Sequence, residues 1–275
     1  MQKVVQDFLN VDDSRLYYEI AGDGEPVIFL HGGFVDSRMW DEQFDLFASR
    51  YRVIRYDQRR YGQSEGSSRP YARHQDLYEL MRHLQIKNAH LVGHSGGGAL
   101  ALDFALVYPQ MVSTLVLYAS GVEGYDWSHM TESYEAPVNI HLEKGELKQA
   151  AEVMLRTWID GPNRRPEDVN FQVRKRVQSL IIDLFKRSDD WQPERPLDPP
   201  TIERLHEINV PTPVLVGAED GIDLLKISDL LVSQIAGSQK IVMPSVAHMM
   251  NMEVADVFNQ AVMKFIEGHS EAKEI

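Results

Sequence analysis

A segment in the first half of the chain, residues 89–109, places one serine between an apolar run and an apolar helical pattern. The run 89–92 is short enough for a buried strand. Apolar residues then recur at helical spacing from position 99 until Pro109, which ends the helix. Between the two patterns lies Gly-His-Ser-Gly-Gly, residues 93–97. The segment therefore predicts a strand, a sharp turn with Ser95 at its apex, and a helix.

The glycines around Ser95 allow this turn to be sharp. Side chains at Gly93 or Gly97 would crowd the neighbouring strand and helix, and a serine on such a turn holds a strained backbone. The turn lifts the Ser95 hydroxyl out of the sheet and leaves the N–H of Gly96 at a helix N-terminus, where an oxyanion would form. The pattern G-x-S-x-G is that of a nucleophile elbow. A glycine-rich turn with a capping serine has the same letters, so partners elsewhere in the chain decide between the two.

The charge of the chain narrows its possible partners. Lys and Arg number 28 and Asp and Glu 41, which gives a formal net charge of −13. Such a surface repels phosphate backbones and anionic lipids, which disfavours binding to nucleic acid or to a membrane surface. Because the chain has no cysteine, disulfides, thiolate nucleophiles and cysteine-based metal sites are excluded. Residues 1–20 lack the apolar stretch of a signal peptide and no run is long enough to span a membrane, so we expect a soluble protein of the cytoplasm.

Strand-like and helical patterns alternate along most of the chain. Apolar or alternating runs predict strands at 4–11, 15–21, 26–30, 52–56, 89–92, 113–118, 213–217 and 240–243. Helical spacing lies between them and after them, including 201–208, 224–235 and a final helix from Glu253. Continuous apolar runs such as 26–30 are typical of strands buried on both faces of a parallel sheet. This alternation predicts an α/β fold with a mostly parallel sheet flanked by helices.

The alternation stops between residues 122 and 200. This stretch contains several helical apolar patterns, is interrupted at Gly161-Pro162, and ends in a proline-rich segment. A helical insertion between two strands of a sheet is most simply a cap over the edge of the sheet, and the alternative is an elaborated crossover. We therefore expect a core made of residues 1–121 and 201–275, with a helical cap at residues 122–200.

A serine hydroxyl needs partners to act as a nucleophile at neutral pH. An imidazole must take its proton, and a carboxylate must fix the tautomer of that imidazole. With an elbow serine, the chain order is serine, acid, histidine. Five of the ten histidines follow Ser95, and only His248 occupies a loop just after a late strand, at the end of a parallel sheet where ligands bind.

The acid of this set has one preferred candidate and three alternatives. Asp220 is preferred because it follows the predicted strand 213–217 and precedes His248 in chain order. Glu219 and Asp223 are close neighbours that are either surface residues or the true partner of the histidine. Glu123 is the third alternative, since it comes soon after the predicted strand 113–118.

An oxyanion hole needs a second N–H, from the loop after an early strand. The sequence His31-Gly32-Gly33-Phe34 follows the predicted strand 26–30 and fits that loop, because its glycines let the backbone come close to a substrate. The expected donors are the N–H groups of Phe34 and Gly96. The Phe34 ring would then form part of the acyl pocket.

Taken as an ordered set, these residues resemble the α/β-hydrolase fold superfamily, in particular its cap-bearing branch of serine esterases, lactonases and carbon–carbon hydrolases. The resemblance covers essentially the whole chain. The matching motifs are His31-Gly32-Gly33-Phe34, Asp57 with Gly62-Gln63-Ser64, Gly93-His94-Ser95-Gly96-Gly97, Gly217-Ala218-Glu219-Asp220 and Ala247-His248. They imply the α/β-hydrolase fold with a helical cap, and they do not specify a substrate.

Three positions depart from the pattern of that superfamily. Arg60 stands where the turn D-x-R-G-x-G-x-S has a glycine, which implies a different loop path or a new charge near the core. Gly221 follows the acid where a proline is common, and Ala247 precedes the histidine where a glycine is usual. None of the three removes a catalytic group.

The resemblance implies a serine hydrolase that cleaves a small-molecule carboxylic ester or lactone and needs no metal or organic cofactor. Ser95 would attack, His248 would carry the proton, and Asp220 would orient the imidazole. The alternatives are carbon–carbon bond hydrolysis or perhydrolysis with the same triad, and a non-catalytic ligand receptor. Phe34 and Gly96 replace the proline and the tryptophan that are typical of proline iminopeptidases, which disfavours a peptidase.

Aromatic side chains in the expected cap are candidates either for the pocket wall or for the interior of the cap. They are Trp127, Tyr134, Trp158, Phe171 and Trp191. Acidic and basic residues are mixed throughout the same stretch, so the sequence indicates no charge preference for the substrate.

Overall fold

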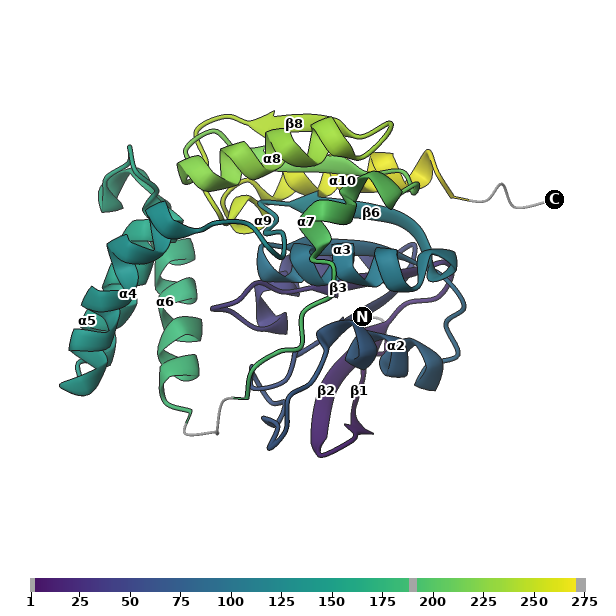
Figure 1. Cartoon of the computed structure of the whole chain (residues 1–275), viewed down its shortest axis with the longest axis horizontal. Coiled ribbons are helices and arrows are strands. Elements are labelled where there is room, and N and C mark those ends of the chain that lie inside the picture. The colour runs from purple at the N-terminus through teal and green to yellow at the C-terminus, as the bar shows by residue number, and fades with distance from the viewer. Residues whose placement is uncertain (1–2, 188–191, 271–275) are drawn as a thin grey trace.

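Eight strands form one sheet within the described residues, 3–187 and 192–270 of the computed structural model (Figure 1). Their order across the sheet is β1-β2-β4-β3-β5-β6-β7-β8. The strands are β1 Val5–Val11, β2 Ser14–Ala21, β3 Pro26–Leu30, β4 Arg52–Tyr56, β5 Ala89–His94, β6 Val112–Tyr118, β7 Pro213–Gly217 and β8 Gln239–Met243. β2 pairs antiparallel with β1 and with β4, and the other neighbours are parallel. The predicted mostly parallel sheet is confirmed.

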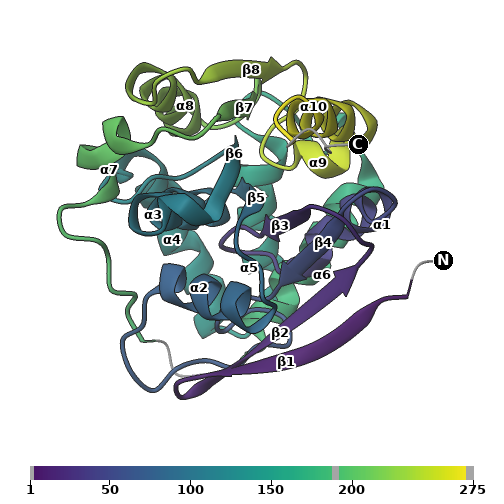
Figure 2. The ribbon, with the colours of Figure 1, turned by 90° about the vertical axis from the view of Figure 1, so that its right-hand side faces the viewer.

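Helices cover both faces of this sheet, as Figure 2 shows, with α2, α3 and α8 on one face and α1 and α10 on the other. These and two short helices are α1 Asp41–Phe47, α2 Arg73–His83, α3 Gly96–Val107, α7 Thr201–Arg204, α8 Ile222–Gln234, α9 Met250–Glu253 and α10 Ala255–Glu267. The central strands are therefore covered on both sides, and Val27, Ile28 and Leu91 are fully buried. This double coverage explains why these strands are continuous apolar runs rather than alternating ones.

Between β6 and α7 the chain leaves the sheet and forms the helices at the left of Figure 1. They are α4 Ser128–Glu143, α5 Leu147–Met154, a π-helical segment Leu155–Asp160 and α6 Phe171–Phe185. Side chains on their facing sides are fully buried, among them Ala150, Ala151, Val177 and Ile181. The division of the chain into a core and a cap at residues 122–200 stays a prediction, and these helices are the part of the molecule to which it refers.

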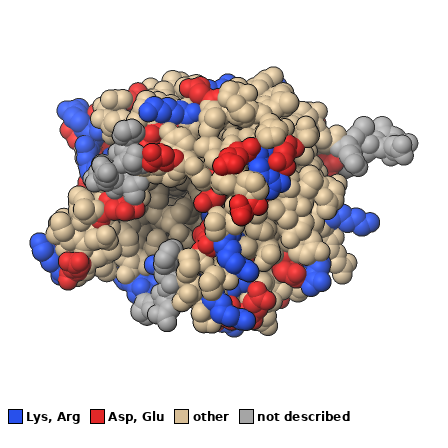
Figure 3. Space-filling view, in the orientation of Figure 1, with Lys and Arg blue, Asp and Glu red and all other residues tan. Residues whose placement is uncertain are grey.

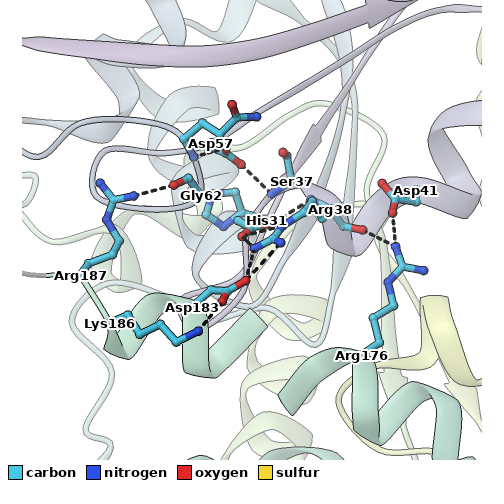
Figure 4. Close-up of polar contacts among 12 residues, drawn as sticks. His31, Ser37, Arg38, Asp41, Asp57, Gly62, Arg176, Asp183, Lys186 and Arg187 are labelled. Atoms are coloured by element: carbon cyan, nitrogen blue, oxygen red, sulfur yellow. Dashed lines mark hydrogen bonds and ion pairs between the residues drawn. The ribbon is translucent and has the colours of Figure 1, made fainter. Parts of the chain in front are cut away.

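Charged side chains anchor α6 to loops at the carboxyl ends of β3 and β4, as Figure 4 shows. The contacts are an ion pair of Arg176 with Asp41, an ion pair of Arg38 with Asp183 at 3.2 Å, and hydrogen bonds from Arg187 to the carbonyl oxygens of Gly62 at 2.5 Å and Ser64 at 2.7 Å. Two of the three arginines lie on α6 or just after it, so the helix is held along its length.

A second anchor follows the π-helical segment. Arg164 donates a hydrogen bond to the carbonyl oxygen of Ser245 at 3.0 Å and forms an ion pair with Glu253 at 2.6 Å. Gly161 has a φ of +74° and lies so close to the carbonyl oxygen of Glu219 that a side chain there would overlap it. These contacts tie the end of the π-helical segment to the loops that follow β7 and β8.

Two predicted helices differ from those observed. The helix expected from Glu253 is α10, which begins at Ala255, and it is preceded by a short helix that was not predicted, α9, which ends at Glu253. The helix expected over 201–208 ends at Arg204 and continues as a 3₁₀ turn, Leu205–Glu207. Apolar spacing records which face of a segment is buried but not its hydrogen-bond geometry, so it does not locate such breaks.

Candidate active site

Ser95 lies at the junction of β5 and α3 in a conformation that few residues adopt. Its φ is 50° and its ψ is −115°, outside the usual regions for a residue with a side chain. The strained backbone is held by two hydrogen bonds, from the N–H of Ser95 to the carbonyl of Tyr118 at 3.1 Å and from the N–H of Gly121 to the carbonyl of Ser95 at 3.0 Å. The predicted sharp turn with a strained serine is therefore present.

The glycines beside Ser95 are required by close packing. A Cβ atom at Gly93 would lie 2.6 Å from the carbonyl oxygen of Gly97, and one at Gly97 would overlap the carbonyl of Leu30. The predicted crowding at both positions is confirmed. Gly98 has the same restriction, because its Cβ atom would overlap Ser120. No role for Gly98 was predicted from the sequence, although its position directly after Gly96 and Gly97 could have indicated close packing there.

The structure brings His248 and Asp220 together in the interior. The Nδ1 atom of His248 lies 3.0 Å from Oδ2 of Asp220, and both residues are buried. The other carboxylate oxygen of Asp220 accepts the N–H of Gly221 at 2.8 Å. The Nε2 atom of His248 is buried and has no hydrogen-bond partner among the described residues. An unpaired buried group of this kind costs about 1–3 kcal/mol, so it marks a position built to receive a proton or a ligand.

The three alternative acids lie in other surroundings. Glu219 accepts a hydrogen bond from Asn163 at 3.2 Å, and Asp223 accepts one from the hydroxyl of Tyr125 at 3.2 Å. Glu123 borders the cavity described below. In the described part of the chain, none of the three is hydrogen-bonded to the histidine.

His31 fixes the loop that was expected to supply an oxyanion donor. The N–H of Gln58 donates to Nε2 of His31 at 2.9 Å, so Nδ1 carries the proton and donates to the carbonyl of Gly32 at 2.8 Å. Burial lowers the pKa of His31 to about 4, so the ring is neutral at physiological pH. The hydroxyl of Tyr61 binds the next carbonyl, that of Gly33, at 2.5 Å.

The two expected oxyanion donors belong to residues that border one cavity with Ser95. Among the described residues, the N–H groups of Phe34 and Gly96 have no protein acceptor. The Phe34 ring is stacked 5.9 Å from the ring of His248 and lies 5.7 Å from that of Trp158. The predicted place of this ring in a pocket wall agrees with the geometry.

His94 lies beneath the histidine loop rather than in the cavity wall. Its Nε2 atom is 3.2 Å from the carbonyl oxygen of His248, and the two rings are 4.5 Å apart. Burial, and then the neighbouring His248 ring, lower the pKa of His94 well below its ordinary value. A Cβ atom at Gly32 would lie 2.5 Å from Nδ1 of His94, so this histidine also explains why position 32 is a glycine.

Arg60, which stands where the superfamily pattern has a glycine, has a backbone conformation that a glycine would also adopt. Arg60 has a φ of 74°, in the left-handed region that glycine adopts without strain. The rest of the turn is held by Asp57, which accepts the N–H groups of Ser37 at 2.9 Å and Gln63 at 2.8 Å. Burial raises the pKa of Asp57 to about 6. A different loop path or a new charge near the core, the two expected consequences of Arg60, stays a prediction.

Arg73 connects the elbow to the rest of the site and was missed from the sequence. Its guanidinium donates to the carbonyl of Gly96 at 2.9 Å and lies 3.4 Å from Oε1 of Gln58. It also forms an ion pair at 2.6 Å with Glu194, which lies in the last part of the helical insertion, after α6. Gln58 in turn donates to the carbonyl of His31 at 2.8 Å. One network thus joins the two segments that carry the expected oxyanion donors, and no local pattern links residues so distant in sequence.

A cavity of about 390 Å³ opens beside Ser95. It is bordered by Gly33, Phe34, Ser95, Gly96, Ala99, Gly121, Val122, Glu123, Trp127, Tyr134, Glu135, Met154 and Trp158. Figure 3 shows a hollow on this face of the molecule, between the helical insertion and the sheet layer. The core therefore supplies the wall with the serine, and α4, α5 and the π-helical segment supply the opposite wall.

The aromatic candidates for the pocket divide into three groups. Trp127, Tyr134 and Trp158 border the cavity. Phe171 does not border it and is 70% exposed, so its place as a pocket residue is wrong. Trp191 lies outside the described residues.

In the described ranges, 3–187 and 192–270, no helix is both long and apolar enough to cross a membrane. The same ranges contain no group of three or more His, Asp or Glu side chains placed to hold a metal ion.

Comparison with known proteins gives a consistent picture. The sequence model of the alpha/beta hydrolase family matches residues 27–261. The chain is 28% identical to a 2-hydroxy-6-oxononadienedioate/2-hydroxy-6-oxononatrienedioate hydrolase of Klebsiella pneumoniae subsp. pneumoniae, over 94% of each chain. Its fold is similar to a carboxylesterase of Bacillus subtilis, with a TM-score of 0.79, 20% identity and coverage of 97% and 92% of the two chains. It is also similar to an enol-lactonase of Burkholderia xenovorans LB400, with a TM-score of 0.73, 22% identity and coverage of 95% and 100%.

Proposed function

The chain belongs to the alpha/beta hydrolase family, and from that premise we propose that it hydrolyses a small-molecule carboxylic ester or lactone through an acyl-enzyme on Ser95. One observation supports this most directly. His248 is bound to Asp220 through Nδ1, while its Nε2 is unpaired among the described residues and its ring lies against two side chains of the cavity that Ser95 borders. An imidazole in this state is a general base for a serine hydroxyl.

The proposed reaction has two steps with one set of groups. His248 takes the proton of the Ser95 hydroxyl as its oxygen attacks the ester carbonyl, and Asp220 stabilises the resulting imidazolium. The N–H groups of Phe34 and Gly96 hold the oxyanion. Collapse of the tetrahedral intermediate breaks the bond to the alcohol, which takes the proton from His248. Water then attacks the acyl-enzyme with His248 as base, and the carboxylic acid leaves.

Carbon–carbon bond hydrolysis of a dicarboxylate is the less suitable use of this cavity. The relative from Klebsiella pneumoniae is named for a dienedioate, which is a dicarboxylate. Among the described residues that border the cavity here, none is Lys or Arg, whereas Glu123 and Glu135 are acidic. A dianion would have no positive partner at these walls and would be repelled by the two glutamates.

The helical insertion, residues 122–200, is proposed as the cap that shapes the substrate. It contributes Trp127, Tyr134, Met154 and Trp158 to the cavity, opposite Ser95. The reacting groups would come from residues 1–121 and 201–275. This arrangement lets the chemistry stay fixed in the core while the cap determines which esters enter.

The proposed activity is tested with p-nitrophenyl esters from acetate to long acyl chains, together with a lactone and a diketone. We expect a burst of about one p-nitrophenol per protein molecule followed by steady turnover, because acylation forms a covalent intermediate before water attacks. The burst is measured by stopped-flow absorbance, and the acylated Ser95 by mass spectrometry of the trapped protein. Cleavage of the diketone without cleavage of any ester or lactone would contradict the proposal.

Replacing Arg73 by methionine is expected to lower kcat for p-nitrophenyl acetate about tenfold with little change in KM. The guanidinium holds the carbonyl of Gly96 and contacts Gln58, so its loss lets the two oxyanion donors drift apart in the transition state. The matched control is Arg82→Met on the same helix, where the arginine is exposed and pairs with Glu79. Equal kcat values in the two variants would contradict a positioning role for Arg73.

A further inference from the structure

The charged side chains that border the cavity beside Ser95 all have the same sign. They are the carboxylates Glu123, half-buried after β6, and Glu135, exposed on α4. No Lys, Arg or His is among the described residues that border this cavity. The remaining wall consists of apolar and aromatic side chains together with glycines and Ser95.

These two glutamates have no partner in the described part of the chain. Neither Glu123 nor Glu135 forms an ion pair or a side-chain hydrogen bond with a described residue. The fully buried acid of the insertion, Asp160, is instead paired with Arg156 at 2.8 Å and with Arg174 at 2.7 Å. The protein therefore neutralises a buried acid of the insertion but leaves both carboxylates at the cavity without a cation of its own.

The aromatic side chains of the same wall suit a cation as well. Trp127, Tyr134 and Trp158 border the cavity, and the rings of Tyr134 and Trp158 are 5.6 Å apart in an edge arrangement. Ring faces attract alkylammonium groups by about 0.5–2 kcal/mol each. Trp158 is only 7% exposed and its Nε1–H has no acceptor among the described residues, so it can donate to an oxygen of a bound molecule.

The electric field outside the cavity has the same sign as its wall. The chain carries a formal net charge of −13, and Figure 3 shows Asp and Glu side chains around the hollow together with some Lys and Arg side chains. A cleft lined by one sign of charge concentrates ligands of the opposite sign and raises their rate of association.

We propose that this cavity selects esters that carry an ammonium group in the acyl or the alcohol part, which the unpaired Glu123 and Glu135 and the aromatic wall bind while Ser95 attacks the ester carbonyl. This inference rests on the proposed ester hydrolysis and specifies its substrate class. The ammonium nitrogen keeps its charge throughout, and the bonds made and broken are those of ester hydrolysis.

The test compares pairs of esters with the same shape and different charge. For the alcohol part the pair is propionylcholine and 3,3-dimethylbutyl propionate. For the acyl part it is the p-nitrophenyl esters of 4-(trimethylammonio)butanoate and 5,5-dimethylhexanoate. In each pair a quaternary carbon replaces the quaternary nitrogen, so the ratio of kcat/KM values isolates the charge. We expect the cationic member to be preferred about tenfold or more in at least one pair, with the preference falling as salt is added.

Variants assign this preference to the cavity. In Glu123→Gln with Glu135→Gln the ratio of kcat/KM values should fall severalfold but stay above one, since the carboxylate charges are gone and the aromatic wall, which also favours the cationic member, remains. The control is a double variant of two exposed glutamates that do not border the cavity, Glu42→Gln with Glu143→Gln, which changes the net charge equally and should keep the ratio of the wild type. A ratio lost equally in the control would assign the preference to the overall field and overturn the role of the two cavity glutamates.

The outcomes separate this inference from the function on which it rests. Turnover of the neutral esters with a ratio at or below one in both pairs overturns the ammonium preference and leaves ester hydrolysis standing. No turnover of any ester, with no labelling of Ser95 by a fluorophosphonate, overturns both.

Discussion

Replacing Ser95 by alanine is expected to lower kcat/KM for p-nitrophenyl acetate by a factor of about 10⁵ and to abolish labelling by a fluorophosphonate. Removal of the nucleophile leaves only binding and the oxyanion donors, and such losses reach about 10⁶ in hydrolases of this mechanism. The side chain makes no hydrogen bond within the described residues, and the backbone bonds of Ser95 to Tyr118 and Gly121 remain. The thermal unfolding midpoint should therefore change by no more than a few degrees.

The control for this variant is Ser233→Ala, an exposed serine on α8 whose hydroxyl bonds only to the carbonyl of its own helix turn. It should label and turn over as the wild type does. Fluorophosphonate labelling that persists in Ser95→Ala would show that the nucleophile is another residue. Gel-based labelling read in parallel with differential scanning fluorimetry separates loss of the nucleophile from loss of the fold.

Replacing Asp220 by asparagine is expected to lower kcat about 10³- to 10⁴-fold with a smaller change in KM. An amide in place of the carboxylate can donate to Nδ1 of His248, which leaves the proton on Nε2 and removes the base that Ser95 needs. It also removes the charge that stabilises the imidazolium. Steady-state kinetics on the ester preferred by the wild type measures both parameters.

The alternative acids supply matched controls for this variant. Glu219→Gln and Asp223→Asn should keep kcat within about threefold of the wild type, because their carboxylates bind Asn163 and Tyr125 and not the histidine. A thousandfold loss in one of these two, with near-normal turnover in Asp220→Asn, would reassign the acid. All three variants should keep the thermal stability needed for measurement, which circular dichroism checks.

Much of the fold follows from local patterns in the sequence. The strand at 26–30 is a continuous apolar run because both faces of the sheet are covered, and this burial is visible residue by residue. The turn at Ser95 is equally local, since its geometry depends on glycines one and two positions away. Chain order then sufficed to choose His248, whose ring the structure places against Asp220.

Contacts between distant segments could not be predicted in the same way. The Arg73 guanidinium lies 2.9 Å from the carbonyl oxygen of Gly96 and also pairs with Glu194. The positions of these three residues in the sequence do not indicate that they are in contact. The break between α9 and α10 is also not located by apolar periodicity, because this periodicity does not record hydrogen-bond geometry. That Glu123 and Glu135 have no ion-pair partner among the described residues could not be predicted, since acidic and basic residues are mixed throughout the sequence of the insertion.

The two anchors fix one part of the helical insertion to the sheet layer and leave another part without such contacts among the described residues. Arg164 and Gly161 pin the end of the π-helical segment, and Arg176 pins α6, so these parts follow the core as one body. The hairpin of α4 and α5, which carries Tyr134 and Glu135, precedes both anchors in the chain and packs against α6 through α5. Exchange of substrate and product is then expected to occur by swinging of this hairpin, while Trp158 stays fixed against the reacting histidine. Turnover limited by that swing would slow with solvent viscosity, and stiffening the hairpin would lower kcat without touching the chemistry.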